Sequence, residues 1–224
     1  MKLIAHRGGR GFGTDNTVDA MEKAVESGVW MIEMDIRRTA DNRLIVCHDA
    51  TVWSHAVARA TYEEIKKHSP ERPLLSEVFE RLAGRVAFNV EVKEAPEGMV
   101  GEMIEAYGLG PETLVTSFQQ PFLERFKESY PYIRTGYLYR MSYREERKLE
   151  NTVEIGTEVI LPYFQSVDRE LVEHAHEIGL EVFAWTVNNE DDCKKLFEWG
   201  VDGAVTDHYL DIKAFLESLE GGGR

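Results

Sequence analysis

Short apolar runs alternate with amphipathic segments of helical periodicity along most of this 224-residue chain. The alternation is most regular after residue 98, where apolar runs at 114–116, 133–137, 158–161, 181–185 and 203–205 are each followed by a predicted helix. Strands that alternate with helices form right-handed βαβ units around a parallel sheet. About eight such units in one domain of this size predict an α/β fold of the (β/α)8 TIM barrel type. We assign the barrel to residues 1–220 and expect 221–224 to be a flexible tail.

An open, doubly wound sheet is the alternative architecture for the same alternation. Nucleotide-binding sheets of that kind carry a Gly-x-Gly-x-x-Gly turn after the first strand. Here the turn after the predicted strand 3–5 contains Gly8-Gly9-Arg10-Gly11, which does not keep that spacing. Residues 50–73 depart from the repeat, because they hold only a short predicted helix at 61–67 and end in prolines. We expect them to form a short excursion after the second strand region.

The charge balance restricts the partners of the chain. Forty acidic against 26 basic residues give a formal net charge of −14, which disfavours nucleic acid and anionic lipid surfaces and favours cations. No apolar run approaches the roughly 20 residues that cross a bilayer, and no signal-peptide pattern precedes the first strand, so we expect a cytoplasmic protein without a membrane span. Cys47 and Cys193 are too few for a disulfide framework or a zinc site.

One predicted strand, Met31–Ile36, carries two carboxylates among apolar residues. Because side chains alternate along a strand, Glu33 and Asp35 share one face. Two like charges side by side in a buried strand are unfavourable unless a cation or hydrogen-bond donors meet them. The alternative is an edge strand whose acidic face is in water. The apolar opposite face favours the buried strand, and with it a positive partner for this pair.

The active site of a TIM barrel lies at the carboxyl ends of its strands. Asp49, Ser117, Thr206 and Asp207 lie at the ends of predicted strands. The main candidates at the same strand ends are His6, Arg7, Glu33, Asp35, His48, Glu91, Lys93, Phe118 and Trp185. The three carboxylates are the hard oxygen ligands that suit Mg²⁺, Ca²⁺ or Mn²⁺. The two histidines can exchange protons near neutral pH, as a general acid and a general base. The arginine and the lysine can donate hydrogen bonds to an anionic oxygen.

Each candidate also has a purely structural explanation. A single histidine is more often hydrogen-bonded for stability than catalytic, and Glu91 with Lys93 could be a simple ion pair on one face of a strand. Trp185 could belong to the core, and Asp207 could cap the last helix. The shared position of His6 and His48 at strand ends is what favours a catalytic role for both.

The ordered set of short motifs closely resembles the glycerophosphodiester phosphodiesterase family over nearly the whole chain. The matching motifs are His6-Arg7-Gly8, Asn16-Thr17, Glu33-x-Asp35, His48-Asp49, Glu91-x-Lys93, Ser117-Phe118, Trp185-Thr186-Val187-Asn188 and Gly200-Val201-Asp202-Gly203-x-x-Thr206-Asp207. The resemblance departs from the family pattern at Asp15, where members usually have Glu, and in a shorter segment after His48-Asp49. In the family that segment covers the site and helps to select the alcohol.

The resemblance implies a metal-dependent hydrolase that converts glycerophosphodiesters to glycerol 3-phosphate and an alcohol, in lipid and glycerol metabolism. By position, Glu33, Asp35 and Glu91 would hold the cation, and His6 and His48 would transfer protons. Arg7 and Lys93 would hold the phosphate, and we expect Phe118 and Trp185 to wall the glycerol carbons. A route through a cyclic phosphate is favoured by analogy over direct attack by water. Two alternatives stay open: a lysophospholipase D that acts on acylated substrates, and a barrel that binds metal or phosphorylated ligands without turnover.

Overall fold

Eight parallel strands close into a barrel in the computed structural model, which describes residues 1–140 and 147–221. The strands, in their order around the barrel, are β1 (Lys2–Ala5), β2 (Met31–Arg38), β6 (Ala87–Glu94), β7 (Thr113–Ser117), β8 (Arg134–Tyr139), β9 (Val159–Pro162), β10 (Glu181–Ala184) and β11 (Gly203–Thr206). Strand β1 closes the barrel because it pairs in parallel with both β2 and β11. The TIM barrel prediction is therefore confirmed, and the open sheet is excluded.

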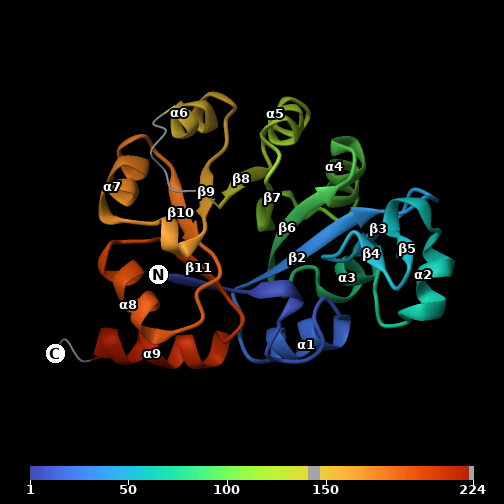
Figure 1. Cartoon of the computed structure of the whole chain (residues 1–224), viewed down its shortest axis with the longest axis horizontal. Coiled ribbons are helices and arrows are strands. Elements are labelled where there is room, and N and C mark those ends of the chain that lie inside the picture. Colours follow the sequence, from blue (N-terminus) through green and yellow to red (C-terminus); the bar gives the residue numbers. More distant parts are fainter. Residues whose placement is uncertain (141–146, 222–224) are drawn as a thin grey trace.

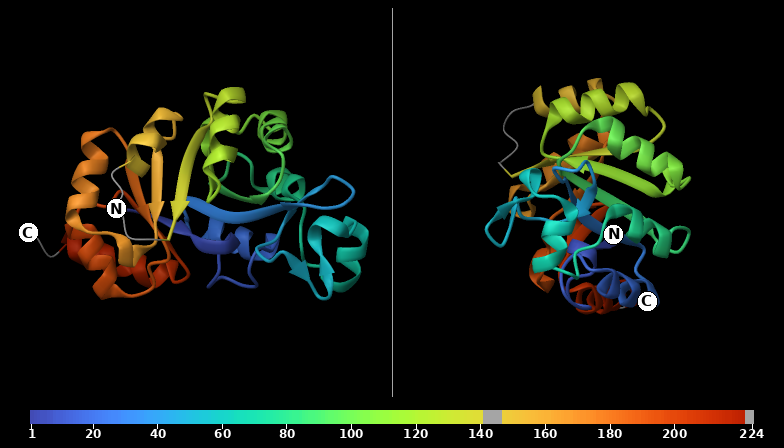
Figure 2. Two further views of the ribbon diagram at one scale, coloured as in Figure 1. Left: turned by 45° about the horizontal axis from the view of Figure 1, so that its top comes forward. Right: turned by 90° about the vertical axis from the view of Figure 1, so that its right-hand side faces the viewer.

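Helices follow the strands and surround the barrel (Figure 1, Figure 2). They are α1 (Val18–Glu26), α2 (Tyr62–His68), α3 (Leu75–Leu82), α4 (Glu97–Ala106), α5 (Gln120–Ser129), α6 (Arg147–Glu154), α7 (Arg169–Glu177), α8 (Glu190–Glu198) and α9 (Tyr209–Gly221). The sequence placed each of them within a few residues, and Thr17 caps α1 by accepting a hydrogen bond from the Ala20 amide. Of the expected tail 221–224, Gly221 is the last residue of α9, and 222–224 lie outside the described residues, as do residues 143–146, where the sequence predicts the start of α6.

One strand, β3 (Leu44–Val46), runs antiparallel to β2 outside the barrel. The chain then makes the predicted excursion, which contains the two-stranded hairpin β4 (Thr51–Val52) and β5 (His55–Ala56) and helix α2. Figure 1 shows this excursion beside the carboxyl ends of β2 and β6. It has a small apolar core of its own, to which Val57, Tyr62 and Ile65 contribute. The sequence pattern did not predict the hairpin, because each of its strands has only two residues.

The apolar residues form two layers, one inside the barrel and one between the barrel and its helices. Ile32, Met34 and Ile36 of β2 belong to the outer layer, so Glu33 and Asp35 point inward. The interior layer consists of Ile4, Met31, Leu114, Leu138, Val159, Leu161, Phe183 and Val205. The alternation along β2 therefore directs its carboxylates into the end of the barrel that these side chains leave open to polar groups. Among the described helices, none is both long and apolar enough to span a bilayer.

The interior layer should carry a large share of the stability. We expect Leu114→Ala to lower the free energy of unfolding by about 2–5 kcal/mol, because Leu114 is 1% exposed and its loss leaves a cavity. The matched substitution Leu210→Ala, at a side chain that is 53% exposed, should change it by about 0.5 kcal/mol or less. Urea denaturation measures both values. Equal effects of the two substitutions would contradict the layered core.

Candidate active site

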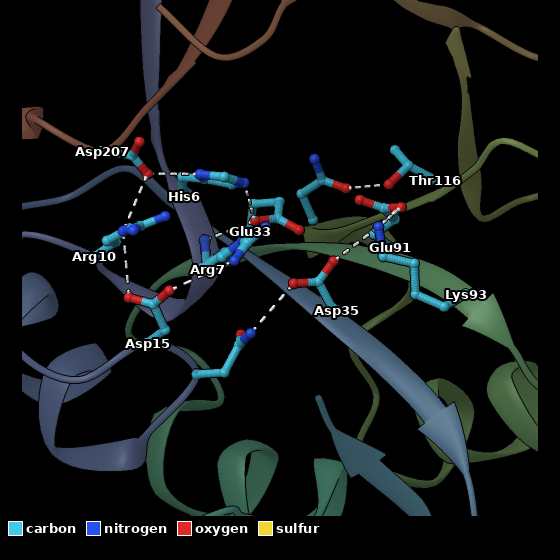
Figure 3. A network of polar contacts seen from close by, with 12 residues as sticks. His6, Arg7, Arg10, Asp15, Glu33, Asp35, Glu91, Lys93, Thr116 and Asp207 are labelled. Carbon is cyan, nitrogen blue, oxygen red and sulfur yellow. Dashed lines mark hydrogen bonds and ion pairs between the residues drawn. The ribbon is translucent and has the colours of Figure 1, made fainter. Parts of the chain in front are cut away.

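The candidate site lies where β1, β2 and β6 end, at one end of the barrel (Figure 3). Strands β2 and β6 pair in parallel with Glu33 opposite Asn89 and Asp35 opposite Glu91. This register sets Asp35 and Glu91 side by side on the inward face. Strand β1 pairs with the beginning of β2, so the turn that follows β1 reaches Glu33 from the other side.

Glu33, Asp35 and Glu91 converge into an acidic triad. One oxygen from each carboxylate lies within 4.8 Å of the others, and all three residues are buried, with exposures of 4%, 1% and 8%. The alternative of an edge strand with its acidic face in water is therefore wrong. Three carboxylates so close together in a buried place cannot all stay ionised without positive charge or hydrogen-bond donors around them.

The electrostatics of the triad favour protonation when no cation is near. Burial, and then repulsion from Asp35 and Glu91, raises the pKa of Glu33 well above its ordinary value. Burial and repulsion from Asp35 likewise raise the pKa of Glu91 to about 7. A cation placed among the three oxygens would reverse both shifts, because it stabilises the ionised form of each carboxylate.

Protein groups compensate only part of the negative charge. The backbone amide of Arg7 donates to Glu33 Oε2 over 2.7 Å, and the side-chain amide of Asn16 donates to Asp35 Oδ2 over 3.2 Å. The ammonium of Lys93 lies 3.1 Å from Asp35 Oδ1 and also contacts Glu91 Oε1. Burial lowers the pKa of Lys93, but the facing carboxylates of Glu91 and Asp35 outweigh it and raise the pKa overall. The single ammonium thus serves two carboxylates.

The triad fits a hard divalent cation. Glu33 Oε1 is buried and has no hydrogen-bond partner among the described residues, so one lone pair of the triad is left for a ligand outside the protein. Carboxylate oxygens at this spacing are the donors that Mg²⁺, Ca²⁺ and Mn²⁺ take in proteins. Such an ion would be held by Glu33, Asp35 and Glu91.

Arg7 sits in a tight turn that directs its backbone toward the triad. It lies in the 3-10 turn η1 (His6–Gly8) with a left-handed backbone, at φ 47° and ψ 51°, which is unfavourable for a residue other than glycine. The chain makes room for the turn at Gly8, where a Cβ would come within 2.6 Å of Met21 Cε. The Nε atom of Arg7 is buried without a partner among the described residues. It is therefore a hydrogen-bond donor in place for an anionic oxygen.

His6 lies between the triad and Asp207, a strand-end residue for which the sequence left a helix cap as the alternative role. Its Nε2 atom is 3.9 Å from Glu33 Oε2, and its Nδ1 atom is 2.7 Å from Asp207 Oδ1. Burial favours the protonated form of Asp207, but the hydrogen bonds with His6 and Asn188 overcome it and hold the pKa at about 2. Asp207 follows β11, the neighbour of β1. The strand-end rule had collected Asp207, and the pairing of β11 with β1 is what brings it to His6.

His48 is positioned by a different strand from His6. It comes just after β3, and the Cys47 amide donates to the backbone oxygen of Asp35 over 2.8 Å. Strand β2 therefore lies between the strands that carry the two histidines. His48 Nδ1 is 2.8 Å from Oδ1 of Asp49, and its backbone oxygen accepts from Arg37. Its side chain is 34% exposed against 16% for His6, and the polar contacts recorded for it are with Asp49 and Arg37.

Aromatic rings line one side of the site. The rings of Phe118 and Trp185 pack edge to face with centroids 5.5 Å apart, and the Lys93 ammonium lies 5.5 Å from the Phe118 ring. Tyr163, which the sequence analysis did not single out, packs on Trp185 at 5.7 Å. It follows Pro162 at the end of β9, so its strand-end position was the signal for it. The rings of Phe118, Trp185 and Tyr163 thus pack together although each follows a different strand.

The comparisons with known proteins agree on one family. The model of the glycerophosphoryl diester phosphodiesterase family matches residues 6–210. The chain is 30% identical over 244 residues to the glycerophosphodiester phosphodiesterase of Caldanaerobacter subterraneus subsp. tengcongensis, with 99% of this chain and 98% of that protein covered. It is 32% identical over 232 residues to the glycerophosphodiester phosphodiesterase of Bacillus altitudinis, with 92% and 94% covered.

A solved structure shares the architecture. The Oleispira antarctica phosphodiesterase, solved in complex with the product sn-glycerol-3-phosphate, superposes with a TM-score of 0.86 at 21% identity, over 97% of each chain. At that identity, the likeness concerns the fold.

Cation binding should depend on the triad. We expect Asp35→Asn to weaken the affinity for Mg²⁺, Ca²⁺ or Mn²⁺ at least about tenfold, because a neutral amide replaces a charged ligand of the same shape. Isothermal titration calorimetry measures the affinity, and circular dichroism checks that the fold is kept. Asp191→Asn, at an exposed position in the first turn of α8, is the matched control and should leave the affinity unchanged. Unchanged affinity in Asp35→Asn would contradict the site.

The raised pKa of Glu91 predicts an unusual pH dependence for the metal-free protein. Between pH 5 and 7 the unfolded chain has released the Glu91 proton while the folded protein still holds it, so stability falls as the pH rises, by about 3 kcal/mol. The carboxyls whose pKa is lowered, such as Asp207 at about 2, act below this window. Thermal unfolding at several pH values in EDTA measures the trend. We expect Glu91→Gln to reduce the trend, with the remainder due to Glu33, whose pKa is also raised, and a trend unchanged in that variant would rule out Glu91 as a source.

Proposed function

The chain belongs to the glycerophosphoryl diester phosphodiesterase family and is a glycerophosphodiester phosphodiesterase, and we propose that it splits these diesters with a divalent cation and two histidines. The products would be glycerol 3-phosphate and an alcohol such as choline, ethanolamine or glycerol. The observation that carries the proposal is the buried triad with an unpaired oxygen, next to His6 and to the free Nε of Arg7. A purely structural cluster of charges would leave none of these groups without a partner.

The cation would be held by Glu33, Asp35 and Glu91. When bound, a divalent ion in such a site neutralises negative charge on a phosphoryl oxygen, which makes the phosphorus easier to attack. The carboxylates of Asp35 and Glu91, which the Lys93 ammonium now contacts, would then have a second positive charge beside them. With that charge balanced, Lys93 is free to turn its ammonium toward the substrate.

Arg7 and Lys93 would hold the phosphate in line for attack. A diester phosphate carries one negative charge over two free oxygens, and a guanidinium with an ammonium beside it matches that charge. The buried, unpaired Nε of Arg7 gains a partner when the phosphate binds. Asp15, 3.7 Å from the Arg7 guanidinium, keeps the rest of that group in place.

His6 and His48 would carry out the proton transfers. One imidazole takes the proton from the attacking oxygen, and the other gives a proton to the departing alkoxide, which is a poor leaving group at neutral pH. If the glycerol hydroxyl attacks first, the product is a cyclic phosphate, and water then opens it with the two roles exchanged. The placement of the histidines on either side of β2 suits this exchange.

Phe118 and Trp185 would form the apolar wall of the substrate site, together with Tyr163. Flat rings exclude water from the side of the phosphate opposite the carboxylates and pack on the carbons of glycerol. A long acyl chain would need a much longer apolar groove, so the comparison of acylated and free substrates distinguishes a phosphodiesterase for small diesters from a lysophospholipase D.

The decisive assay measures glycerol 3-phosphate released from glycerophosphocholine and glycerophosphoethanolamine. We expect release to stop in EDTA and to return with Mg²⁺, Ca²⁺ or Mn²⁺. His6→Ala should reduce kcat by about 10²–10⁴-fold, the usual contribution of a general acid or base. His174→Ala, at a histidine on α7 paired with Glu177, is the matched control and should keep full activity.

Four outcomes would change the proposal. Release in EDTA, or full activity of His6→Ala, would exclude the mechanism. No release from any diester, with a cation bound, would favour a barrel that binds without turnover. Faster turnover of lysophosphatidylcholine than of glycerophosphocholine would favour the lysophospholipase D.

A further inference from the structure

The two nitrogens of the His6 ring face different partners. Nδ1 is 2.7 Å from Asp207 Oδ1, while Nε2 points to the acidic triad, 3.9 Å from Glu33 Oε2 (Figure 3). An imidazole that hydrogen-bonds a carboxylate at Nδ1 must carry its proton there, which leaves the lone pair on Nε2. The contact with Asp207 therefore decides which nitrogen of His6 can accept a proton from the reacting groups.

We propose that Asp207 is a positioning residue that fixes the tautomer and orientation of His6, and that Asn188 in turn fixes Asp207. The inference rests on the proposed function, because it assigns the role of a residue that touches neither substrate nor cation. Asp207 comes from the far end of the chain: it lies 201 residues after His6 and contacts it only because β11 pairs with β1.

Asn188 has only one orientation available. Its Oδ1 atom accepts hydrogen bonds from the Asp207 amide over 2.9 Å and from the Thr206 hydroxyl over 3.3 Å. Both are donors, so the oxygen of Asn188 must face them and its Nδ2 must face Asp207 Oδ2, at 2.7 Å. The Asp207 carboxylate thus uses one oxygen for Asn188 and the other for His6, and the Nε atom of Arg10 lies 3.9 Å from that second oxygen. Because a backbone amide starts this chain of hydrogen bonds, its direction is set by the fold.

Two other histidine–aspartate pairs provide comparisons. Asp49, the partner of His48, is 74% exposed and adjacent in sequence, so water competes for its hydrogen bond. Asp202 pairs with His176 over 2.8 Å before the start of β11, at the end of that strand opposite the site. The His6–Asp207 pair is more buried than either, with side chains 16% and 17% exposed, while Asn188, the other partner of Asp207, is at the surface.

The first test is Asp207→Asn. Asn188 still presents its Nδ2 donor, so the new amide turns its oxygen to Asn188 and its NH₂ group to His6 Nδ1. His6 must then accept at Nδ1 and carry its proton on Nε2, the nitrogen that faces the reacting groups. We expect kcat to fall about 10²–10⁴-fold, a loss of the size seen when an aspartate that orients a catalytic histidine becomes an amide. The KM and the cation affinity should stay within about twofold of the native values, because the residues that would bind substrate and cation are unchanged.

The second test exchanges the two side chains, combining Asp207→Asn with Asn188→Asp. The carboxylate at position 188 accepts from the backbone amide of residue 207 and from the new amide side chain, which then offers its oxygen to His6. The proton returns to Nδ1 without any change in total charge. We expect the exchange to restore kcat at least about tenfold over the single variant. A merely structural role for Asp207 predicts no such rescue.

Nitrogen NMR of ¹⁵N-histidine-labelled protein tests the tautomer without any substrate, because it distinguishes a protonated Nδ1 from a protonated Nε2 in a neutral ring. We expect the proton on Nδ1 in the native protein and in the exchanged variant, and on Nε2 in Asp207→Asn. Asp202→Asn removes a histidine–aspartate pair outside the site and should keep native kcat.

A native His6 with its proton on Nε2 would overturn the inference, even if Asp207→Asn did not fold. Native kcat in Asp207→Asn, or an exchanged variant as slow as the single one with its tautomer restored, would also overturn it. If the native protein hydrolyses no glycerophosphodiester, the proposed function fails, while the NMR result still decides the role of Asp207.

Discussion

The repulsion among three buried carboxylates is the constraint on which the rest of this structure depends. Glu33, Asp35 and Glu91 lie within 4.8 Å of one another because β2 and β6 pair in a fixed register, and that register cannot shift without moving the apolar side chains of β2 out of the core. The surrounding groups, the Arg7 amide and the Lys93 ammonium among them, offset the charge only in part. The free energy gained by packing the apolar side chains thus exceeds the electrostatic cost of keeping these three carboxylates together.

Closure of the barrel adds a second group of residues beside the acidic triad. The pairing of β1 with β11 joins the two ends of the chain, so that His6 from the first strand and Asp207 from the last face each other. A sheet that stayed open between these strands would keep the triad, since β2 and β6 are neighbours in either case, but it would lose the partner of His6. The proposed cation binding and the proposed proton transfer therefore depend on different parts of the same fold.

The local parts of the structure could be predicted from the sequence, and the long-range parts could not. The periodicity of residues 31–36 placed Glu33 and Asp35 on one face, and the strand-end rule collected His6, Arg7, Lys93 and the aromatic wall. Roles for these residues came from the resemblance to a family. Asp207 was collected at a strand end with a helix cap as its alternative role, but its contact with His6 was not predicted, because it depends on the register in which β11 pairs with β1. Strand β3 was expected to follow the parallel repeat, yet it returns antiparallel beside β2, since a short turn at 39–42 joins the two.

The antiparallel strand β3 separates the excursion from the strands that carry the acidic triad. His48 is the last site residue before the excursion, and the chain re-enters the barrel framework only at α3. Loop length between residues 49 and 73 can grow or shrink without altering the β2–β6 register, because neither strand spans that interval. An insertion in this segment would lengthen the chain beside the carboxyl ends of β2 and β6 while leaving Glu33, Asp35 and Glu91 in place.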